Sequence, residues 1–134
     1  MPNLLIVEDN AILATTLVRF LRGQDATNVV MVAPSAEAAL EELRRSVVDL
    51  ALIDVALPGI NGIDLVVILR QQYPNLKCLM LSGHNEADYV GRALAAGAQG
   101  YVIKGDPLAI IEAVQRVLSG KTYLSKELQG KLRH

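Results

Sequence analysis

Five polar side chains of this sequence come directly after short apolar runs, and together they could transfer a phosphoryl group. Glu8 and Asp9 follow the first run, Asp54 the third, Ser82 the fourth and Lys104 the fifth. Crowded carboxylates raise one another's pKa unless a cation lies among them. A few oxygen ligands favour Mg²⁺, which takes one or two carboxylates and keeps several waters. Beside such an ion, Asp54 could attack phosphorus in line while Lys104 neutralises the phosphoryl oxygens.

Each of these residues also has a plainer interpretation. An acid after a strand is often a helix N-cap or a solvated loop residue. Ser82 alone would suit a turn, and Lys104 alone would suit the surface. All five follow apolar runs, however, and the carboxyl ends of parallel strands lie at one edge of a sheet. The conjunction therefore favours a site over five separate loop residues.

The elements that must position these side chains alternate between strand and helix. Apolar runs without polar alternation are typical of strands buried on both faces in a parallel sheet. The five predicted strands span residues 4–7, 29–32, 50–53, 78–81 and 101–103. The alternation predicts an α/β fold, a three-layer sandwich with helices on both sides of the sheet. In a sheet of order 2-1-3-4-5, the strand order reverses between strands 1 and 3, where the three acids would meet.

Helical periodicity fills the segments between the predicted strands. The apolar face of the first helix includes Phe20, and that of the second extends to Val47. Glu41 and Arg45 are spaced to pair on the exposed side of the second helix. A third helix lies between strands 3 and 4, and a shorter fourth begins at about Glu86.

The fifth helix has clear ends and more apolar residues than one packed face needs. Asp106 suits its N-cap, Pro107 its first position and Gly120 its C-terminal end. Its apolar residues form two neighbouring faces, Ile111, Val114 and Leu118 in one and Ile110, Ala113 and Val117 in the other. A helix apolar over so much of its girth is usually buried on more than one side. The pattern leaves open whether a homodimer forms there or whether Leu124 and Leu128 of the tail cover it.

Length and composition indicate a single domain with an aliphatic core. The chain has 134 residues, of which only five are aromatic. Its formal charge of −1 argues against a nucleic-acid or membrane surface over most of the protein. The one cysteine, Cys78, excludes an internal disulfide and falls in a strand, where core packing is expected. There is no signal-peptide pattern and no apolar run long enough to span a bilayer, so we expect a cytoplasmic protein.

The polar residues lie in segments with specific spacings: an acidic pair, an Asp followed four residues on by Pro and eight on by Gly, a Ser and a Lys. The segments are Val7-Glu-Asp-Asn10, Asp54-Val-Ala-Leu-Pro-Gly-Ile-Asn-Gly62, Leu81-Ser-Gly83 and Ala96-Gly-Ala-Gln-Gly-Tyr-Val-Ile-Lys104. With these segments the chain resembles the response-regulator receiver domains of two-component signalling, over about residues 3 to 120. The resemblance implies the flavodoxin-like receiver fold, a five-stranded parallel sheet of order 2-1-3-4-5 with five helices.

The resemblance also implies how the acids would act. Asp54 would accept a phosphoryl group from the phosphohistidine of a sensor histidine kinase. Mg²⁺ would be bound by Asp9, Asp54 and the backbone carbonyl of Ala56, with Glu8 acting partly through water. The chain would then be no enzyme beyond the Mg²⁺-dependent phosphorylation and dephosphorylation of its own Asp54.

Three further residues would complete the switch implied by the resemblance. Lys104 and the hydroxyl of Ser82 would hold phosphoryl oxygens. On phosphorylation Ser82 would move toward the phosphate and Tyr101 would rotate inward, remodelling the face made by helix 4, strand 5 and helix 5. Such a change is a two-state element biased by a local charge. A homodimer through this face is one of the two possibilities left open above for the fifth helix.

The end of the sequence narrows the resemblance. Tyr101-Val-Ile-Lys-Gly-Asp-Pro-Leu108 and Gly120-Lys-Thr-Tyr-Leu-Ser-Lys-Glu-Leu128 are similar to LuxR-type (NarL/FixJ) transcription regulators, in which this tail leads into a helix-turn-helix domain. The expected function is therefore the receiver part of a DNA-binding transcriptional response regulator. The alternative is a stand-alone single-domain response regulator that acts by protein-protein interaction.

The same resemblance implies how the chain is organised. Residues 1–120 would form the receiver domain, and residues 121–134 would form a linker or a short C-terminal helix, with the output domain absent from this chain. In that helix Ser125 would be the cap, and Leu128 and Leu132 would face inward. No direct nucleic-acid binding and no membrane contact are expected from this chain.

Three positions depart from or vary within the receiver pattern. Many receivers place Pro after the lysine with a cis bond, whereas this chain has Gly105 there. A cis bond without proline costs about 3 kcal/mol, so the Lys104–Gly105 peptide should be trans or visibly strained. Ala56 and His84, two residues beyond Asp54 and Ser82, would control how water reaches the phosphate. Ala56 leaves that path open, and His84 either blocks it or is solvated.

Three other functions are less well supported by the residues. A phosphatase of the haloacid dehalogenase type would need a second acid two residues after its nucleophile, where this chain has Ala56. A nucleotide- or flavin-binding domain would need a glycine fingerprint, and the glycines at 59, 62, 97 and 100 fit neither the dinucleotide pattern nor a phosphate loop. A degenerate receiver would have lost some of the acids, Ser82 or Lys104, all of which are present.

Overall fold

The apolar runs of the sequence form one parallel sheet. The computed structural model describes residues 2–23, 29–83 and 88–129. The strands are β1 (Asn3–Val7), β2 (Val29–Ala33), β3 (Leu50–Asp54), β4 (Lys77–Ser82), β5 (Gly100–Ile103) and β6 (Tyr123–Leu124). Their order is β2-β1-β3-β4-β5-β6, and each neighbouring pair is parallel. The predicted strand order is therefore confirmed for the first five strands.

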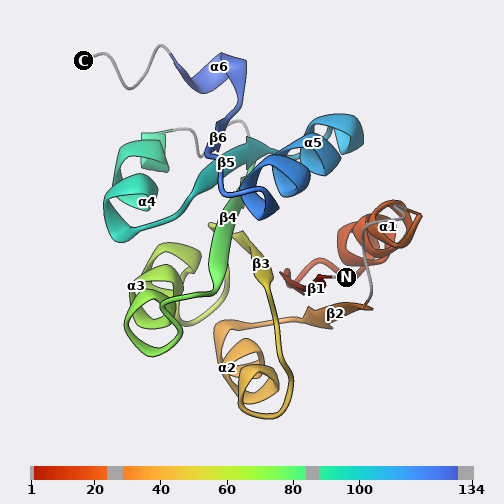
Figure 1. The fold of residues 1–134 in the computed structure, drawn as a ribbon, viewed down its shortest axis with the longest axis vertical. Helices are drawn as coiled ribbons and strands as arrows, with labels where there is room; N and C mark the ends of the chain where they lie inside the picture. The colour runs from red at the N-terminus through yellow and green to blue at the C-terminus, as the bar shows by residue number, and fades with distance from the viewer. Residues whose placement is uncertain (1, 24–28, 84–87, 130–134) are drawn as a thin grey trace.

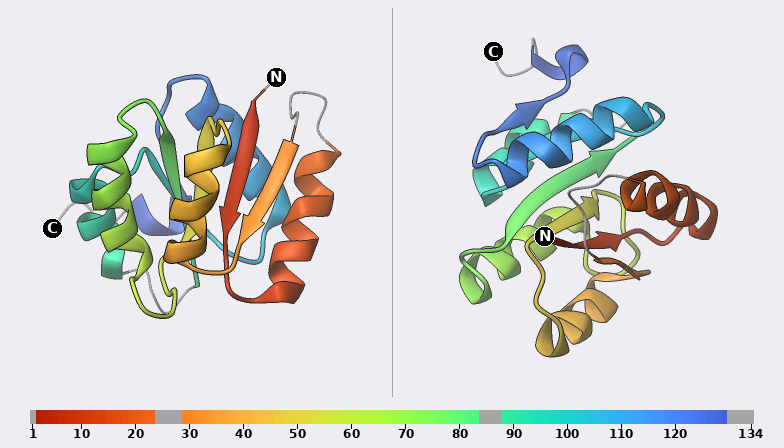
Figure 2. Two further views of the ribbon diagram at one scale, coloured as in Figure 1. Left: turned by 90° about the horizontal axis from the view of Figure 1, so that it is seen from below. Right: turned by 45° about the vertical axis from the view of Figure 1, so that its right-hand side comes forward.

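Helices cover both faces of this sheet. They are α1 (Ala11–Arg22), α2 (Ala36–Arg45), α3 (Gly62–Gln72), α4 (Val90–Ala96), α5 (Pro107–Leu118) and α6 (Lys126–Gln129). Figure 1 shows α1 and α5 on one side of the strands and α2, α3 and α4 on the other, and the views in Figure 2 agree. The predicted three-layer α/β sandwich is confirmed.

Polar caps begin the helices that follow β1 and β5. The Asn10 side chain accepts hydrogen bonds from two backbone amides of α1, those of Ile12 and Leu13. Asp106 caps α5, as predicted, by accepting from the Ala109 amide. Such caps satisfy amides that have no partner within the helix.

The core consists of two aliphatic layers, one on each side of the sheet. Alternate residues of a strand point to opposite faces, so Leu5 and Val7 pack with α2, α3 and α4, whereas Leu4 and Ile6 pack with α1 and α5. Cys78 is buried in the first layer, as predicted, and burial raises the pKa of its thiol to about 11.

Several predictions about the helices were wrong in detail. Phe20 is 41% exposed, and Val47 is 78% exposed because α2 ends at Arg45 and the chain is extended at Ser46. Glu41 pairs with Arg44 rather than with Arg45, which pairs with Glu42. The predicted fourth helix begins at Val90, and its predicted start at Glu86 lies outside the described residues.

The tail forms a sixth strand, which the sequence analysis did not predict. After Gly120, whose φ of +87° ends α5, the chain turns back and pairs with β5 through Tyr123 and Leu124. The short helix expected in the tail is α6, with Leu128 buried as predicted. Leu132 lies outside the described residues. The segment 121–129 is therefore docked on the sheet.

The tail covers a different side of the domain from the one considered in the sequence analysis. Leu124 and Leu128 pack in the layer of α2, α3 and α4, and only Tyr123 packs on the α5 side. On α5, Ile110, Ala113, Val114 and Val117 are buried, whereas Ile111 and Leu118 are partly buried. Within the described parts of the chain, no helix is both long and apolar enough to cross a membrane.

Candidate functional site

Strands β1 and β3, at the centre of the sheet, bring three carboxylates together. Asp54 is the last residue of β3, and Glu8 follows β1, which pairs with β3 through Val7 and Ile53. Glu8 and Asp54 are buried, whereas Asp9 is exposed. One carboxylate oxygen from each lies within 4.8 Å of the other two.

Lys104 reaches this cluster from the end of β5. Its Nζ donates to Oδ2 of Asp54 at 3.0 Å and lies 3.1 Å from Oε1 of Glu8, and its side chain is 26% exposed. Oε1 of Glu8 forms this ion pair but has no hydrogen-bond partner among the described residues. The other oxygen, Oε2, accepts from the backbone amide of Asn10 at 3.0 Å.

The charges of the cluster do not balance. Three carboxylates face one ammonium, which leaves two excess negative charges when all four groups are ionised. Burial, together with the nearby charge of Asp54, raises the pKa of Glu8 to about 7, although the Asn10 amide and Lys104 act in the opposite direction. Burial disfavours the charged form of Lys104, but the hydrogen bond to Asp54 and the negative charges of Asp54 and Glu8 outweigh it and raise the pKa of Lys104.

These observations fit a divalent cation. The donors are oxygens only, one buried carboxylate oxygen lacks a hydrogen bond, and the excess charge is two. Oxygen ligands and waters around a small site are what Mg²⁺ prefers. The residues present therefore suit the predicted ion.

Ser82 lies beside the cluster, but its hydroxyl makes no hydrogen bond to the cluster among the described residues. It ends β4, is buried, and its hydroxyl donates to the carbonyl of Gly83 at 2.9 Å. Its own carbonyl accepts from the Lys104 amide at 2.7 Å. Ser82 thus helps to place the lysine through the backbone, while its hydroxyl is engaged within its own loop.

The loop after Asp54 is folded against the strand end. The amide of exposed Ala56 donates to Oδ1 of Asp54 at 3.1 Å. Gly62, at the start of α3, leaves room for this arrangement, because an added Cβ would collide with the carbonyl oxygen of Asp54. Its amide donates to the carbonyl of Val55.

Two other residues named by the sequence lie on β5 and its continuation. Tyr101 is fully buried, in the layer that contains Leu124 and Leu128. The Lys104–Gly105 peptide is trans, which is one of the two outcomes predicted from the sequence. Gly105 has a φ of +102°. His84 lies outside the described residues.

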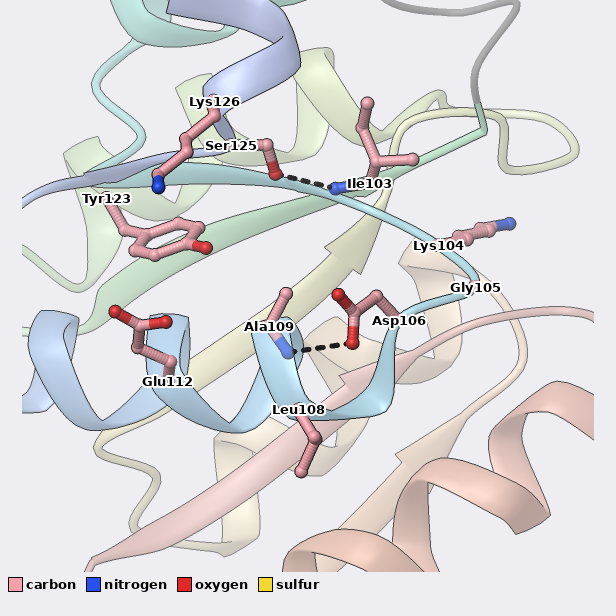
Figure 3. Close-up of a pocket in the computed structure, with 10 residues that line it drawn as sticks. All are labelled: Ile103, Lys104, Gly105, Asp106, Leu108, Ala109, Glu112, Tyr123, Ser125 and Lys126. Atoms are coloured by element: carbon pink, nitrogen blue, oxygen red, sulfur yellow. Dashed lines mark hydrogen bonds between the residues drawn. The ribbon is translucent and has the colours of Figure 1, made fainter.

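A pocket of about 490 Å³ lies on the α5 side of β5, and Lys104 is the lining residue that it shares with the charged cluster (Figure 3). Its lining includes Asp106, Glu112, Tyr123 and Lys126 but none of the three clustered acids. In Figure 3 the Lys104 side chain extends away from Tyr123 and Lys126. The three clustered acids therefore lie outside this pocket.

The sequence analysis missed one residue beside this site. Ser125 stands directly before α6 and its carbonyl accepts from the Leu128 amide at 2.9 Å, as a cap should, but its hydroxyl accepts from the backbone amide of Ile103, the residue before Lys104. No sequence signal links these two residues, because the bond joins positions 22 apart across a strand pair that only the fold creates.

Comparison with known proteins agrees with this geometry. Residues 4–115 match the family described as the response regulator receiver domain. The chain belongs to this family. Receiver domains are phosphorylation-dependent signalling switches of two-component systems, so the predicted family and functional class are confirmed.

Individual relatives of this receiver are regulators of the same kind. The transcriptional activator protein ExaE of Pseudomonas putida is 37% identical over 131 residues, which are 96% of this chain and 61% of ExaE. The response regulator GacA of Pseudomonas viridiflava is 33% identical over 133 residues, which are 98% of this chain and 62% of GacA. The receiver therefore spans about three fifths of the length of these relatives.

A solved structure matches this receiver over nearly its whole length. It is a two-component response regulator of the LuxR family from Aurantimonas sp. SI85-9A1, with a TM-score of 0.91 and 25% identity. The match covers 99% of this chain and 96% of that chain. The predicted fold is thus confirmed, and the described residues add a sixth strand, β6, to the five that were predicted.

Proposed function

We propose that this chain accepts a phosphoryl group on Asp54 from the phosphohistidine of a sensor histidine kinase. The observation that carries the proposal is the buried carboxylate of Asp54, held 3.0 Å from the Lys104 ammonium within a cluster of three acids. A carboxylate oxygen carries the electron pair for attack and needs no separate base to act as a nucleophile. Geometry, charge and family all support this role.

In the proposed transfer, a carboxylate oxygen of Asp54 forms the new bond to phosphorus. The bond from phosphorus to the histidine nitrogen of the donor breaks, and the imidazole keeps that electron pair. Lys104 then exchanges part of its contact with Asp54 for the phosphoryl oxygens, and the Ser82 hydroxyl would leave the Gly83 carbonyl to donate to another. The reaction needs positioning and charge neutralisation more than covalent help.

Glu8, Asp9, Asp54 and the backbone carbonyl of Ala56 would hold Mg²⁺ in this proposal. When bound, the ion supplies positive charge that neutralises the phosphoryl oxygens. The unbonded Oε1 of Glu8 and the two excess negative charges of the cluster support such a site.

The output proposed for the whole protein is transcription control. ExaE is named a transcriptional activator, and the Aurantimonas protein is named a LuxR-family regulator. In such a protein residues 1–120 would be the receiver, and residues 121–134 would connect it to a DNA-binding domain. A homodimer would use the face of α4, β5 and α5, to which β6 and α6 add their own surface.

Intact mass measurement tests the central proposal. The chain is incubated with acetyl phosphate in the presence of Mg²⁺ or of a chelator. We expect one phosphoryl adduct that requires Mg²⁺ and is absent from Asp54→Asn. Asp64→Asn, which changes an exposed acid of α3, is the matched control and should retain the adduct. Persistence of the adduct in Asp54→Asn, or its absence from the unaltered chain, would overturn the proposal.

A further inference from the structure

The strand that carries Lys104 has a very short outer neighbour. Strand β6 pairs with β5 only through Tyr123 and Leu124, opposite Gly100 and Tyr101. Backbone bonds flank this pairing, from the Tyr123 amide to the Gln99 carbonyl and from the Ser125 amide to the Tyr101 carbonyl, each at 3.2 Å. Beyond them the chain leaves the sheet and enters α6.

The next backbone amide of β5 on this side is that of Ile103, and no strand residue remains to accept from it. In a parallel strand, amides at alternate residues bond to neighbours on opposite sides. Ser125 supplies the missing acceptor, because its hydroxyl oxygen lies 3.2 Å from the Ile103 amide (Figure 3). Both residues are buried, with 6% of Ile103 and 8% of Ser125 exposed where they line the pocket. The side chain thus extends the ladder by one step.

Lys104 is the residue that follows this step. Its amide donates to the Ser82 carbonyl of β4 at 2.7 Å, and the preceding amide donates to Ser125 on the other side. After Lys104 the chain passes through exposed Gly105, where an added Cβ would meet nothing within 4 Å. Packing around Gly105 therefore contributes little to the position of Lys104. The hydrogen bonds of the Ile103 and Lys104 amides fix the direction from which the ammonium reaches Asp54.

We propose that Ser125 is a positioning residue for phosphoryl transfer to Asp54, acting through the Ile103 peptide on Lys104. This inference rests on the proposed function, because it requires that Lys104 assist the transfer. Ser125 itself contacts neither the carboxylates of the cluster nor the ammonium of Lys104. The Ile103 peptide connects Ser125 to Lys104. Small displacements of a positioned catalytic group cost rate out of proportion to their size.

The test compares two serine substitutions in the full chain. Ser125→Ala removes the acceptor, while Ser119→Ala removes a serine hydroxyl that bonds only to the Gln115 carbonyl at the end of α5. With Mg²⁺ and acetyl phosphate, Ser125→Ala should lower the phosphorylation rate about three- to tenfold. Ser119→Ala should leave the rate unchanged, and Ser125→Thr, which keeps the hydroxyl, should restore it. Mg²⁺ affinity should stay the same in all three.

A double substitution separates positioning from a general structural effect. Once Lys104→Ala has removed the ammonium, Ser125→Ala should lower the residual rate no further, since interacting residues are non-additive. Equal fold losses in the presence and absence of Lys104 would overturn the inference. If the unaltered chain does become phosphorylated, equal rates for Ser125→Ala and Ser119→Ala would also overturn the inference.

Hydrogen exchange gives a measurement that does not depend on phosphorylation. In the unaltered chain the Ile103 amide should exchange slowly. In Ser125→Ala it should exchange faster than in Ser119→Ala, while the Ile53 amide in the centre of the sheet stays unchanged. An unprotected Ile103 amide in the unaltered chain would contradict the bond. If the unaltered chain forms no adduct at all, the proposed function fails and the positioning role fails with it, whatever the exchange shows.

Discussion

The acids and the lysine of the site are held by two different parts of the sheet. Glu8 and Asp54 extend from β1 and β3, which have a strand on each side and helices on both faces. Lys104 extends from β5, whose outer neighbour is two residues long and comes from the tail. The acid half is therefore enclosed by full-length strands on both sides, whereas the lysine half pairs with β4 on its inner side and with only the two-residue β6 of the tail on its outer side.

This difference has a physical consequence. Stability is not uniform within a domain, and segments with few buried contacts open at lower free-energy cost than the core does. The acid half, Glu8 and Asp54, should therefore lose its arrangement only when the domain unfolds. The lysine half can change while the rest of the fold persists, which is what a switch requires.

The largest expected effect lies in the acid half. Gly62→Ala would place a Cβ against the Asp54 carbonyl oxygen and 2.9 Å from the Cα of Val55, both parts of the backbone. We expect the free energy of unfolding to fall by about 3 kcal/mol or more, since overpacked backbone has little room to move. Urea denaturation measures this value.

Gly91→Ala is the control for that substitution. An added Cβ at Gly91 of α4 meets nothing within 4 Å, so the change should be neutral or stabilising by about 0.5 kcal/mol. Equal midpoints of unfolding for the two variants would show that the end of β3 is less tightly packed than the structure indicates.

The next effect concerns pH. Burial raises the pKa of Glu8 from 4.5 in the unfolded chain to about 7 in the folded one, so the folded state binds the proton more tightly. This contribution to stability is complete below pH 4.5 and is lost as pH rises toward 7. In Mg²⁺-free solution, Glu8→Gln should therefore gain about 2 to 3 kcal/mol relative to the unaltered chain between pH 4.5 and 8.

Urea denaturation at several pH values with a chelator present would measure that difference. Glu112→Gln, at an exposed position of α5, is the matched control and should follow the unaltered chain. A constant difference between Glu8→Gln and the unaltered chain across this range would contradict the burial of an ionisable carboxyl at this point.

The smallest effect is expected in the lysine half. Leu128 of α6 is 1% exposed and packs against the layer that contains Tyr101, so Leu128→Ala should cost about 2 kcal/mol of global or tail stability. Hydrogen exchange should show the loss at Ile103 more than at Ile53. Leu108→Ala, at a position 76% exposed on α5, should change neither value by more than about 0.5 kcal/mol.

Most of the fold could be predicted because each strand carries a local pattern. The run before Asp54 is buried on both faces, and the alternation of such runs with helical segments specifies the layers. The acids could be placed together because parallel strands end at the same edge. Side-chain exposure was harder to predict: Phe20 and Val47 matched the helical period, yet the position of a helix end and its neighbours determine which apolar residues are covered.

The tail could not be predicted from the sequence in the same way. A strand of two residues, Tyr123 and Leu124, has no periodicity of its own, and it forms only because β5 offers an open edge. Ser125 precedes a short helix, so a capping role was the natural prediction. Its hydroxyl bonds to Ile103 instead, because the sheet leaves that amide without an acceptor.

The short pairing of β6 with β5 also determines how a signal could leave the domain. Thermodynamic linkage is reciprocal: if docking of residues 121–129 makes phosphorylation of Asp54 more favourable, phosphorylation must favour docking by the same free energy. The modification would then change the fraction of time that the tail spends on the sheet, with no need for a large rearrangement of the core. Any segment that continues from Gln129 would sense that fraction as a change in its own freedom.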